Sequence, residues 1–197
     1  VAQAGQSFSL GRAKVEFLAP LGIYDDINDI SLVAKVTFGE TTFLFTGDAE
    51  RPSEQDMADS DEDLSATVLK VGHHGSNTSS SYVFLRNVMP QYAVISCGAG
   101  NSYGHPHEEV LSRLRDINAT VYRTDLNGTV VCRSDGKNVS FTVEKGSKPV
   151  ETPRPELKGG YIGNMKSKKF HTPDCTSVQD MDAKNRIVFA TRAEAIR

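Results

Sequence analysis

The sequence predicts an α/β fold with a mixed sheet, in which one sheet packs on another and the helices lie outside. Short apolar runs typical of strands recur through the first 143 residues, and segments with helical periodicity lie between several of them. The chain has 197 residues, of which 38% are hydrophobic, so it can hold one moderate domain and a small appendage. No uncharged apolar stretch approaches the roughly 20 residues that a membrane-spanning helix needs.

The N-terminal part is predicted to begin with a β-hairpin. Residues 8–10 and 15–18 alternate apolar and polar side chains on either side of Gly11. After an acidic loop at residues 22–29, we expect strands at residues 31–38 and 41–46. The strand at residues 41–46 contains three consecutive apolar side chains, which is typical of a strand buried on both faces.

Helices and strands alternate through the middle of the chain. The polar run at residues 76–81 is suited to capping the N-terminus of a helix, and Pro106 fits the first position of another. Glu108 and Glu109 suit the first turn of that second helix. We therefore expect helices at residues 50–60, 82–88 and 106–118, and strands at residues 68–71 and 92–96.

Three more strands are expected towards the C-terminus, at residues 120–124, 128–133 and 138–143. The first two are joined through Asn127-Gly128, a strong turn signal. Prolines and charged residues then indicate a linker at residues 146–159, which separates a domain at 1–145 from a small α+β module at 160–197. A helix is expected to start near residues 192–196, and a module of fewer than about 40 residues usually needs a metal or a disulfide.

Charge and cysteine usage narrow the classes of protein. Residues 1–150 carry 13 Lys and Arg against 19 Asp and Glu, so the main domain is not a basic nucleic-acid platform, whereas residues 151–197 have a net charge of +3. Cys97, Cys132 and Cys175 are too few and too widely spaced for a disulfide framework, and the first two are expected to be buried free thiols.

Four polar side chains follow three predicted strands at the points where those strands end. Asp48 follows one strand, His73 and His74 follow the next, and His105 follows a loop after a third. Functional side chains collect at the C-terminal ends of strands in an α/β sheet. The positions of these four side chains therefore predict that they form one site.

Imidazole and carboxylate groups are the ligands of zinc, manganese and iron, and a metal pair would supply hydroxide at neutral pH for phosphodiester hydrolysis. Asp48 is expected to bridge two ions. His73 and His105 are expected to be metal ligands. His74, as the histidine that does not bind metal, and Ser76 are expected to donate hydrogen bonds to a phosphoryl oxygen. Adjacency alone does not decide between His73 and His74, because neighbouring side chains in an extended segment point opposite ways.

Residues 28–33, 46–50, 71–76 and 103–106 closely resemble the C-terminal half of the metallo-β-lactamase-fold domain found in ComEC-like competence proteins. The resemblance covers residues 1–145. It implies an αββα sandwich, a metal-dependent hydrolase with two zinc ions in the intact domain (manganese or iron being alternatives), and phosphodiester or nucleic-acid substrates in DNA uptake.

One departure from this family bears on activity. The first metal-binding motif of the family, His-x-His-x-Asp-His, does not occur in this sequence. We therefore expect that the N-terminal part of the domain belongs to the same polypeptide, and that the 197 residues alone are inactive. Stoichiometric metal and phosphodiesterase turnover by these residues alone would contradict that expectation.

The C-terminal residues 160–197 resemble a small Ada-like metal-binding module that is appended to secreted nucleases and to soluble relatives of this hydrolase. The resemblance makes His171 and Cys175 candidate zinc ligands and favours an extracellular or cell-surface location. The pair of cysteines expected to complete that site does not occur in the sequence. Lys166, Lys168 and Lys169 are candidates for contacts with phosphates, or form a solvated basic face.

Two other functions remain open from the sequence. One keeps the fold and changes the substrate to a phosphocholine ester, a lactone or a β-lactam. The other is a non-catalytic protein in which the C-terminal module binds nucleic acid or cell-surface material. A His-x-His-x-Asp-His motif in the preceding part of the polypeptide would favour the enzyme, and its absence the binding protein.

Overall fold

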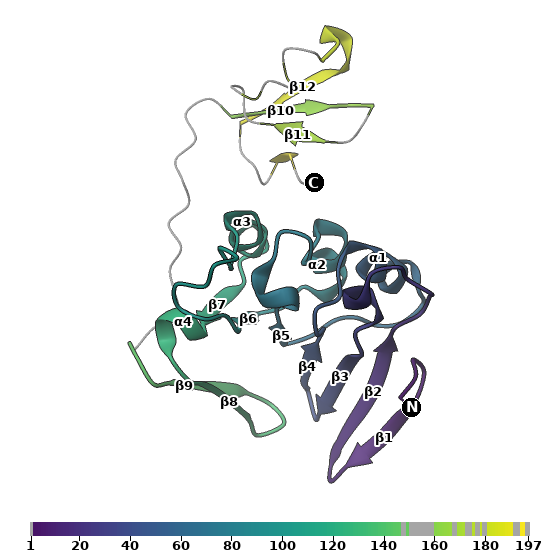
Figure 1. The fold of residues 1–197 in the computed structure, drawn as a ribbon, viewed down its shortest axis with the longest axis vertical. Helices are drawn as coiled ribbons and strands as arrows, with labels where there is room; N and C mark the ends of the chain where they lie inside the picture. Colours follow the sequence, from purple (N-terminus) through teal and green to yellow (C-terminus); the bar gives the residue numbers. More distant parts are fainter. Residues whose placement is uncertain are drawn as a thin grey trace. The chain divides into compact units, whose positions relative to one another are not determined.

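A seven-stranded mixed sheet is the framework of the first of two compact units. The computed structural model describes residues 2–146, 149, 160–166, 169–171, 175, 178, 181–190 and 194–195. The units are Val1–Thr152 and Pro153–Arg197. The large sheet runs in sequence order (Figure 1), through β1 (Ser7–Leu10), β2 (Ala13–Ala19), β3 (Val33–Phe38), β4 (Thr41–Phe45), β5 (Val68–Lys70), β6 (Tyr92–Ile95) and β7 (Thr120–Arg123).

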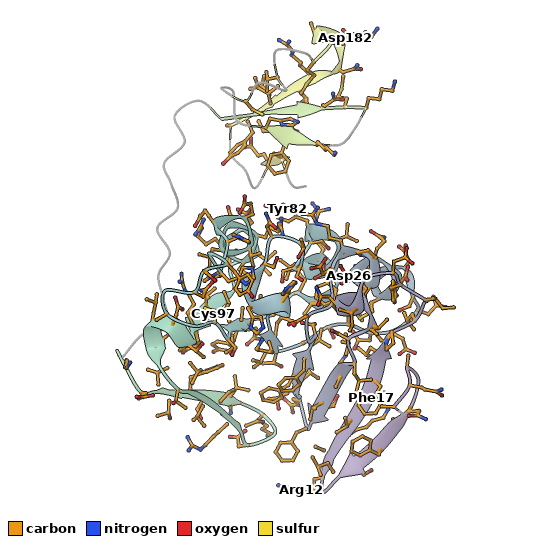
Figure 2. The ribbon with its side chains drawn as sticks, in the orientation of Figure 1. Arg12, Phe17, Asp26, Tyr82, Cys97 and Asp182 are labelled. Atoms are coloured by element: carbon orange, nitrogen blue, oxygen red, sulfur yellow. The ribbon has the colours of Figure 1, made fainter. Side chains whose placement is uncertain are left out.

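The pairing of the strands changes from antiparallel to parallel at β4. The pairs from β1 to β4 are antiparallel, whereas β4 to β7 are joined by parallel pairs. The hairpin of β1 and β2 was predicted, and a cation–π contact joins Arg12, at its tip (Figure 2), to the ring of Phe38 on β3 at 5.0 Å. Parallel strands need crossovers, and helices supply them between β4 and β7.

Three helices cover one face of the large sheet. They are α1 (Arg51–Asp59), α2 (Tyr82–Val88) and α3 (Glu108–Asp116). Ser81 caps α2 by accepting a hydrogen bond from the backbone N–H of Phe84, as the polar run before this helix predicted. α3 begins at Glu108 and not at Pro106, because His107 is extended and acts as the N-cap.

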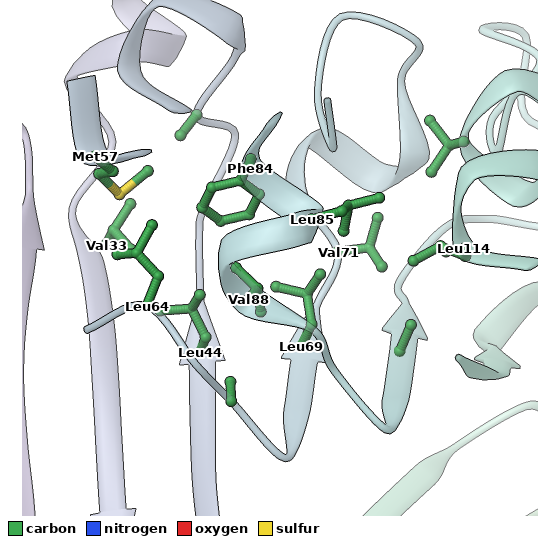
Figure 3. Close-up of a cluster of buried hydrophobic side chains, with 14 of the residues drawn as sticks. Val33, Leu44, Met57, Leu64, Leu69, Val71, Phe84, Leu85, Val88 and Leu114 are labelled. Atoms are coloured by element: carbon green, nitrogen blue, oxygen red, sulfur yellow. The ribbon is translucent and has the colours of Figure 1, made fainter. Parts of the chain in front are cut away.

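The core lies between these helices and the sheet. Leu44 and Leu69 from the sheet are fully buried against Phe84 and Leu85 of α2, with Met57 of α1 beside them (Figure 3). Each of these apolar side chains stabilises the fold by roughly 1.5–3 kcal/mol when it leaves water. The core therefore holds rigidly the strands whose C-terminal ends carry the candidate site.

A second, two-stranded sheet packs on the other face. β8 (Val130–Ser134) and β9 (Val139–Val143) form an antiparallel hairpin. The ring of Phe141 stacks on Tyr122 with centroids 4.3 Å apart and lies 4.9 Å from the ring of Tyr92, on the strand positions that alternate with the core positions. The predicted α/β class with a mixed sheet is therefore confirmed, whereas the αββα sandwich stays a prediction.

Two local predictions in this unit are wrong. Asn127-Gly128 does not join paired strands, because residues 124–127 form a short helix, α4 (Thr124–Asn127), and β7 and β8 belong to different sheets. The Asn127 side chain accepts the backbone N–H of Arg123, and the Asn127 carbonyl accepts that of Lys145. These bonds direct the chain out of the large sheet. The predicted loop at 22–29 also ends in a short 3₁₀ helix, η1 (Ile27–Ile30).

The second unit contains a three-stranded antiparallel sheet in the order β11-β10-β12. Its elements are β10 (Tyr161–Asn164), β11 (Phe170–His171), η3 (Ala183–Asn185) and β12 (Arg186–Phe189). The guanidinium of Arg186 donates hydrogen bonds to the carbonyls of Val178 and Met181. The predicted linker at 146–159 and helix start at 192–196 fall mostly outside the described residues.

Within the parts of both units that the structure describes, the helices are all too short or too polar to cross a membrane.

Candidate metal and phosphodiester site

Four loops meet at one edge of the large sheet. β2 is antiparallel to β3, which is antiparallel to β4, so β2 runs in the same direction as the parallel strands from β4 to β7. The loops after β2, β4, β5 and β6 therefore leave the same edge of the sheet. Ligand sites of open α/β sheets form at such edges.

Asp48 is presented by a tight turn after β4. Gly47 has φ of 55°, and a Cβ at this position would lie 2.9 Å from the Cβ of Ser31, so a side chain is excluded here. The hydroxyl of Ser31 accepts the backbone N–H of Asp48 at 3.1 Å. The Asp48 side chain is 43% exposed and its Oδ1 lies 3.7 Å from Nε2 of His74. The backbone of Asp48 is thus held in place, and its carboxylate is open to a ligand.

His73 and His74 both turn towards the site. They have φ values of 45° and 55°, in the left-handed region, so the extended geometry in which neighbours point opposite ways does not hold. The centroids of their rings are 6.3 Å apart, and the ring of His105 lies 5.7 Å from His73 and 6.5 Å from His74. The left-handed backbone at His73 and His74 therefore brings three imidazole rings, from two loops, into one cluster.

Hydrogen bonds define the tautomer of both neighbours. Nδ1 of His73 lies 2.8 Å from Oε1 of Glu50, and Nδ1 of His74 lies 2.7 Å from the carbonyl oxygen of Ser96. A carbonyl and an ionised carboxylate only accept, so both Nδ1 atoms carry the proton. In the neutral form of each ring the lone pair is then on Nε2, which is the arrangement of a metal-binding histidine whose other nitrogen is held by a hydrogen-bond acceptor.

Glu50 is a residue of the candidate site that the sequence prediction missed. Besides His73, its Oε1 accepts a hydrogen bond from the hydroxyl of Thr78 at 2.8 Å and a longer one of 3.4 Å from the side chain of Asn28. Asp29 is buried and accepts the backbone N–H of Glu50 at 3.0 Å. The sequence signal that could have indicated Glu50 is its position two residues after Asp48, which places a second carboxylate near the same strand end.

His105 is held at the end of a loop that one asparagine closes. The Asn101 side chain accepts the backbone N–H of His105 and donates to the carbonyls of His105 and Gly98. Desolvation by burial, followed by the nearby rings of His107, His73 and His74, lowers the pKa of His105. A lowered pKa keeps this imidazole neutral, the form that binds metal.

His107 was also missed as a residue of this site. Its Nδ1 accepts the backbone N–H of Asn77 at 3.0 Å, so in the neutral ring the proton is on Nε2. Its ring lies 4.9 Å from that of His105. The backbone N–H of His107 donates to the carbonyl of Gly75, where a Cβ would lie 2.6 Å from Cβ of Pro106. The two histidine loops are thus packed directly on one another.

Ser76 is 5% exposed, and its hydroxyl lies 2.8 Å from that of Thr78. Thr78 in turn donates to Glu50, so these two hydroxyls form a chain behind His73. The predicted direct contact of Ser76 with a phosphoryl oxygen stays a prediction, and its surroundings indicate a role in supporting the loop.

Two buried charges hold the loop at residues 76–81. The carboxylate of Glu54 accepts the backbone N–H groups of Ser80 and Ser81, and the guanidinium of Arg113 donates to the carbonyls of Ser79 and Ser80. Glu54 is 1% exposed, and desolvation by burial raises its pKa, which Arg113 opposes. The polar backbone of a buried loop is in this way satisfied from both sides.

The side chains at this edge suit a first-row metal, since they combine neutral imidazoles with a carboxylate. In the described part of the chain, no group of three or more His, Cys, Asp or Glu side chains is already arranged to hold a metal ion. In the second unit, Sγ of Cys175 lies 3.5 Å from Nδ1 of His171, so these two predicted ligands are close together.

Curated proteins similar to this chain are competence proteins and related proteins. The chain is 40% identical over 116 residues to ComE operon protein 3 of Bacillus subtilis (strain 168), and 44% identical over 117 residues to competence protein ComA of Neisseria gonorrhoeae. It is 41% identical over 103 residues to recombination protein 2 of Haemophilus influenzae. No protein-family model matches the chain.

These matches cover 59%, 58% and 52% of the chain and only 15%, 17% and 13% of the three relatives. The chain therefore spans about one sixth of the length of the curated relatives that it matches. The similarity to competence proteins agrees with the ComEC-like resemblance of the sequence.

Proposed function

We propose that the first unit is part of a metal-dependent hydrolase of the metallo-β-lactamase fold, which cleaves phosphodiesters, nucleic acids foremost, during DNA uptake. One observation carries this proposal. The Nδ1 atoms of His73 and His74 both donate hydrogen bonds to oxygen acceptors, so that the Nε2 lone pairs of both rings are available to a ligand. Asp48 and His105 lie beside them. The similarity to competence proteins supports the substrate.

Asp48, His73 and His105 are proposed to hold the metal, zinc foremost, with manganese or iron as alternatives. We assign His74 to the same role, because with its proton on Nδ1 the metal-binding, neutral form of its ring has an acceptor at Nε2 and no proton to donate to a phosphoryl oxygen. When bound, the metal lowers the pKa of a water molecule towards about 7 and so supplies hydroxide. The chain's own groups orient the ligands, and Glu50 keeps the proton of His73 on Nδ1.

The site is proposed to be completed by the preceding part of the same polypeptide. The family that the sequence resembles contributes a His-x-His-x-Asp-His motif, and four ligands for two ions leave coordination positions for it. We therefore expect hydrolysis by the full-length protein and none by these 197 residues. His171 and Cys175 are proposed as two ligands of a separate zinc in the second unit, which their 3.5 Å separation supports.

The proposed function is tested on the full-length protein with Asp48→Ala and His105→Ala. Hydrolysis of bis-p-nitrophenyl phosphate and of single-stranded DNA should fall by at least about 100-fold in each variant, because each removes a ligand of the catalytic metal. Asp61→Ala is the matched control, since Asp61 is exposed and lies outside the candidate site. Wild-type turnover by both site variants would show that the site is assigned wrongly.

A further inference from the structure

An exposed tyrosine stands beside the candidate site. Tyr103 is 77% exposed, which leaves most of its ring in contact with water. The ring lies nearly parallel to that of His105, with centroids 5.7 Å apart and an angle of 23° between their planes. A large aromatic side chain so placed contributes little to the core, so its position needs another explanation.

The loop that carries Tyr103 is held in place. Asn101 closes it with hydrogen bonds at both ends, to Gly98 and to His105, within 2.6–2.9 Å. A Cβ added at Gly98 or Gly100 would meet no atom within 4 Å, so the loop is open on its outer side. The tyrosine is therefore presented to solvent from a fixed position and has space around it.

The charge of the unit limits how it can hold a polyanion. Residues 1–150 carry 19 acidic and 13 basic side chains, so this part of the chain does not have the net positive charge on which most nucleic-acid binding depends. Base stacking on an aromatic ring supplies affinity without positive charge, at about 1–3 kcal/mol for each base. Bases inside a duplex are stacked on both faces, whereas an unpaired base can offer a free face for such a contact.

We propose that Tyr103 is a stacking platform for one unpaired nucleobase next to the phosphodiester bound at the site. The inference rests on the proposed function and adds a preference for single-stranded nucleic acid. His105 stacks beside one part of the tyrosine ring, and the exposed part receives the base. The affinity that Tyr103 provides depends little on salt concentration.

The test compares Tyr103→Ala, Tyr103→Leu and Tyr103→Phe in the full-length protein. Two fluorescein-labelled 20-nucleotide strands are used, one of thymidines and one of abasic sites on the same backbone. Fluorescence anisotropy measures binding, and initial rates of cleavage measure KM and kcat. Circular dichroism checks that each variant is folded, which is expected for an exposed position.

For the thymidine strand, Tyr103→Ala and Tyr103→Leu should raise Kd and KM by about tenfold, and Tyr103→Phe should bind as the wild type does. For the abasic strand, all four proteins should be alike. An equal loss on both strands, or wild-type binding by Tyr103→Leu, would overturn the stacking role. Absence of cleavage by the wild type would reject the proposed hydrolysis, whereas the anisotropy data would still decide the role of Tyr103.

Discussion

The two loops that bring histidines to the candidate site are supported in different ways. The loop after β5, at residues 71–81, is tied to the core by the buried charges of Glu54 and Arg113. The loop after β6, at residues 96–107, is closed by the partly exposed side chain of Asn101 and leaves Tyr103 exposed. The difference indicates that changes behind the first loop act on folding, whereas changes in the second act on function.

The largest effect is expected from Arg113→Ala. This change leaves the carbonyls of Ser79 and Ser80 without their donor and the Glu54 carboxylate without its neighbouring cation. Breaking such a buried arrangement should lower the free energy of unfolding by about 3–5 kcal/mol. Urea denaturation measures it, with the exposed Arg133→Ala as control, expected to change it by less than about 0.5 kcal/mol. Similar unfolding free energies for Arg113→Ala and Arg133→Ala would show that the first loop is not tied to the core by Arg113.

Glu50 supports the first loop from outside it, so Glu50→Gln should separate an effect on function from an effect on folding. The substitution keeps the size of the side chain and weakens the bond that holds His73 in its metal-binding tautomer. Loss of such a supporting carboxylate typically lowers metal affinity or activity by about 10–100-fold. Zinc titration of the full-length protein measures it, with the exposed Glu62→Gln as control. Unchanged zinc affinity in Glu50→Gln would exclude this supporting role.

Asn101→Ala should affect the second loop with little loss of stability. Its hydrogen bonds are partly exposed to solvent, so their loss should cost no more than about 1–2 kcal/mol of unfolding free energy. Displacement of His105 should still lower kcat/KM for bis-p-nitrophenyl phosphate by about tenfold. A loss of stability as large as that of Arg113→Ala would show that the two loops are supported alike.

The smallest effect lies outside both loops. Hydrogen bonds from Ser65 and from the buried amine of Lys35 lower the pKa of Asp63 to about 2. Because the pKa is lower in the folded state, this group stabilises the fold above about pH 5, and the contribution is lost as the pH falls towards 2. Asp63→Asn should flatten the unfolding free energy between pH 2 and pH 4, measured by urea denaturation. Because Asp63 lies outside both loops, Asp63→Asn should change this pH dependence by the same amount in Arg113→Ala and in Asn101→Ala.

Much of the fold was predictable because local signals agreed with the tertiary structure. The polar run ending at Ser81 predicted a helix at 82–88, which is the extent of α2. Apolar runs located the strands of the large sheet to within one or two residues. The turn signal Asn127-Gly128 was misleading because it does not say which sheet the next strand joins. Hydrogen bonds of Asn127 to the nearby Arg123 and to Lys145, 18 residues away, decide that.

The sequence predicted which side chains of the candidate site lie together, and it said less about their geometry. The strand ends predicted that Asp48, His73 and His105 meet at one edge of the sheet, and the structure brings them there. The left-handed backbone that turns His73 and His74 to the same side has no residue signal, because non-glycine residues rarely adopt it. Glu50 and His107 were missed because their roles depend on partners, Thr78 and Asn77, about 30 residues away along the chain.

The central claim is that Asp48 and His105 bind metal in a hydrolytic site. Metal content after dialysis, measured by mass spectrometry on the full-length protein and on the Asp48→Ala/His105→Ala double variant, tests it most directly. We predict that the double variant contains at least one zinc, manganese or iron ion fewer than the wild type. Equal metal content in two folded proteins would contradict the claim.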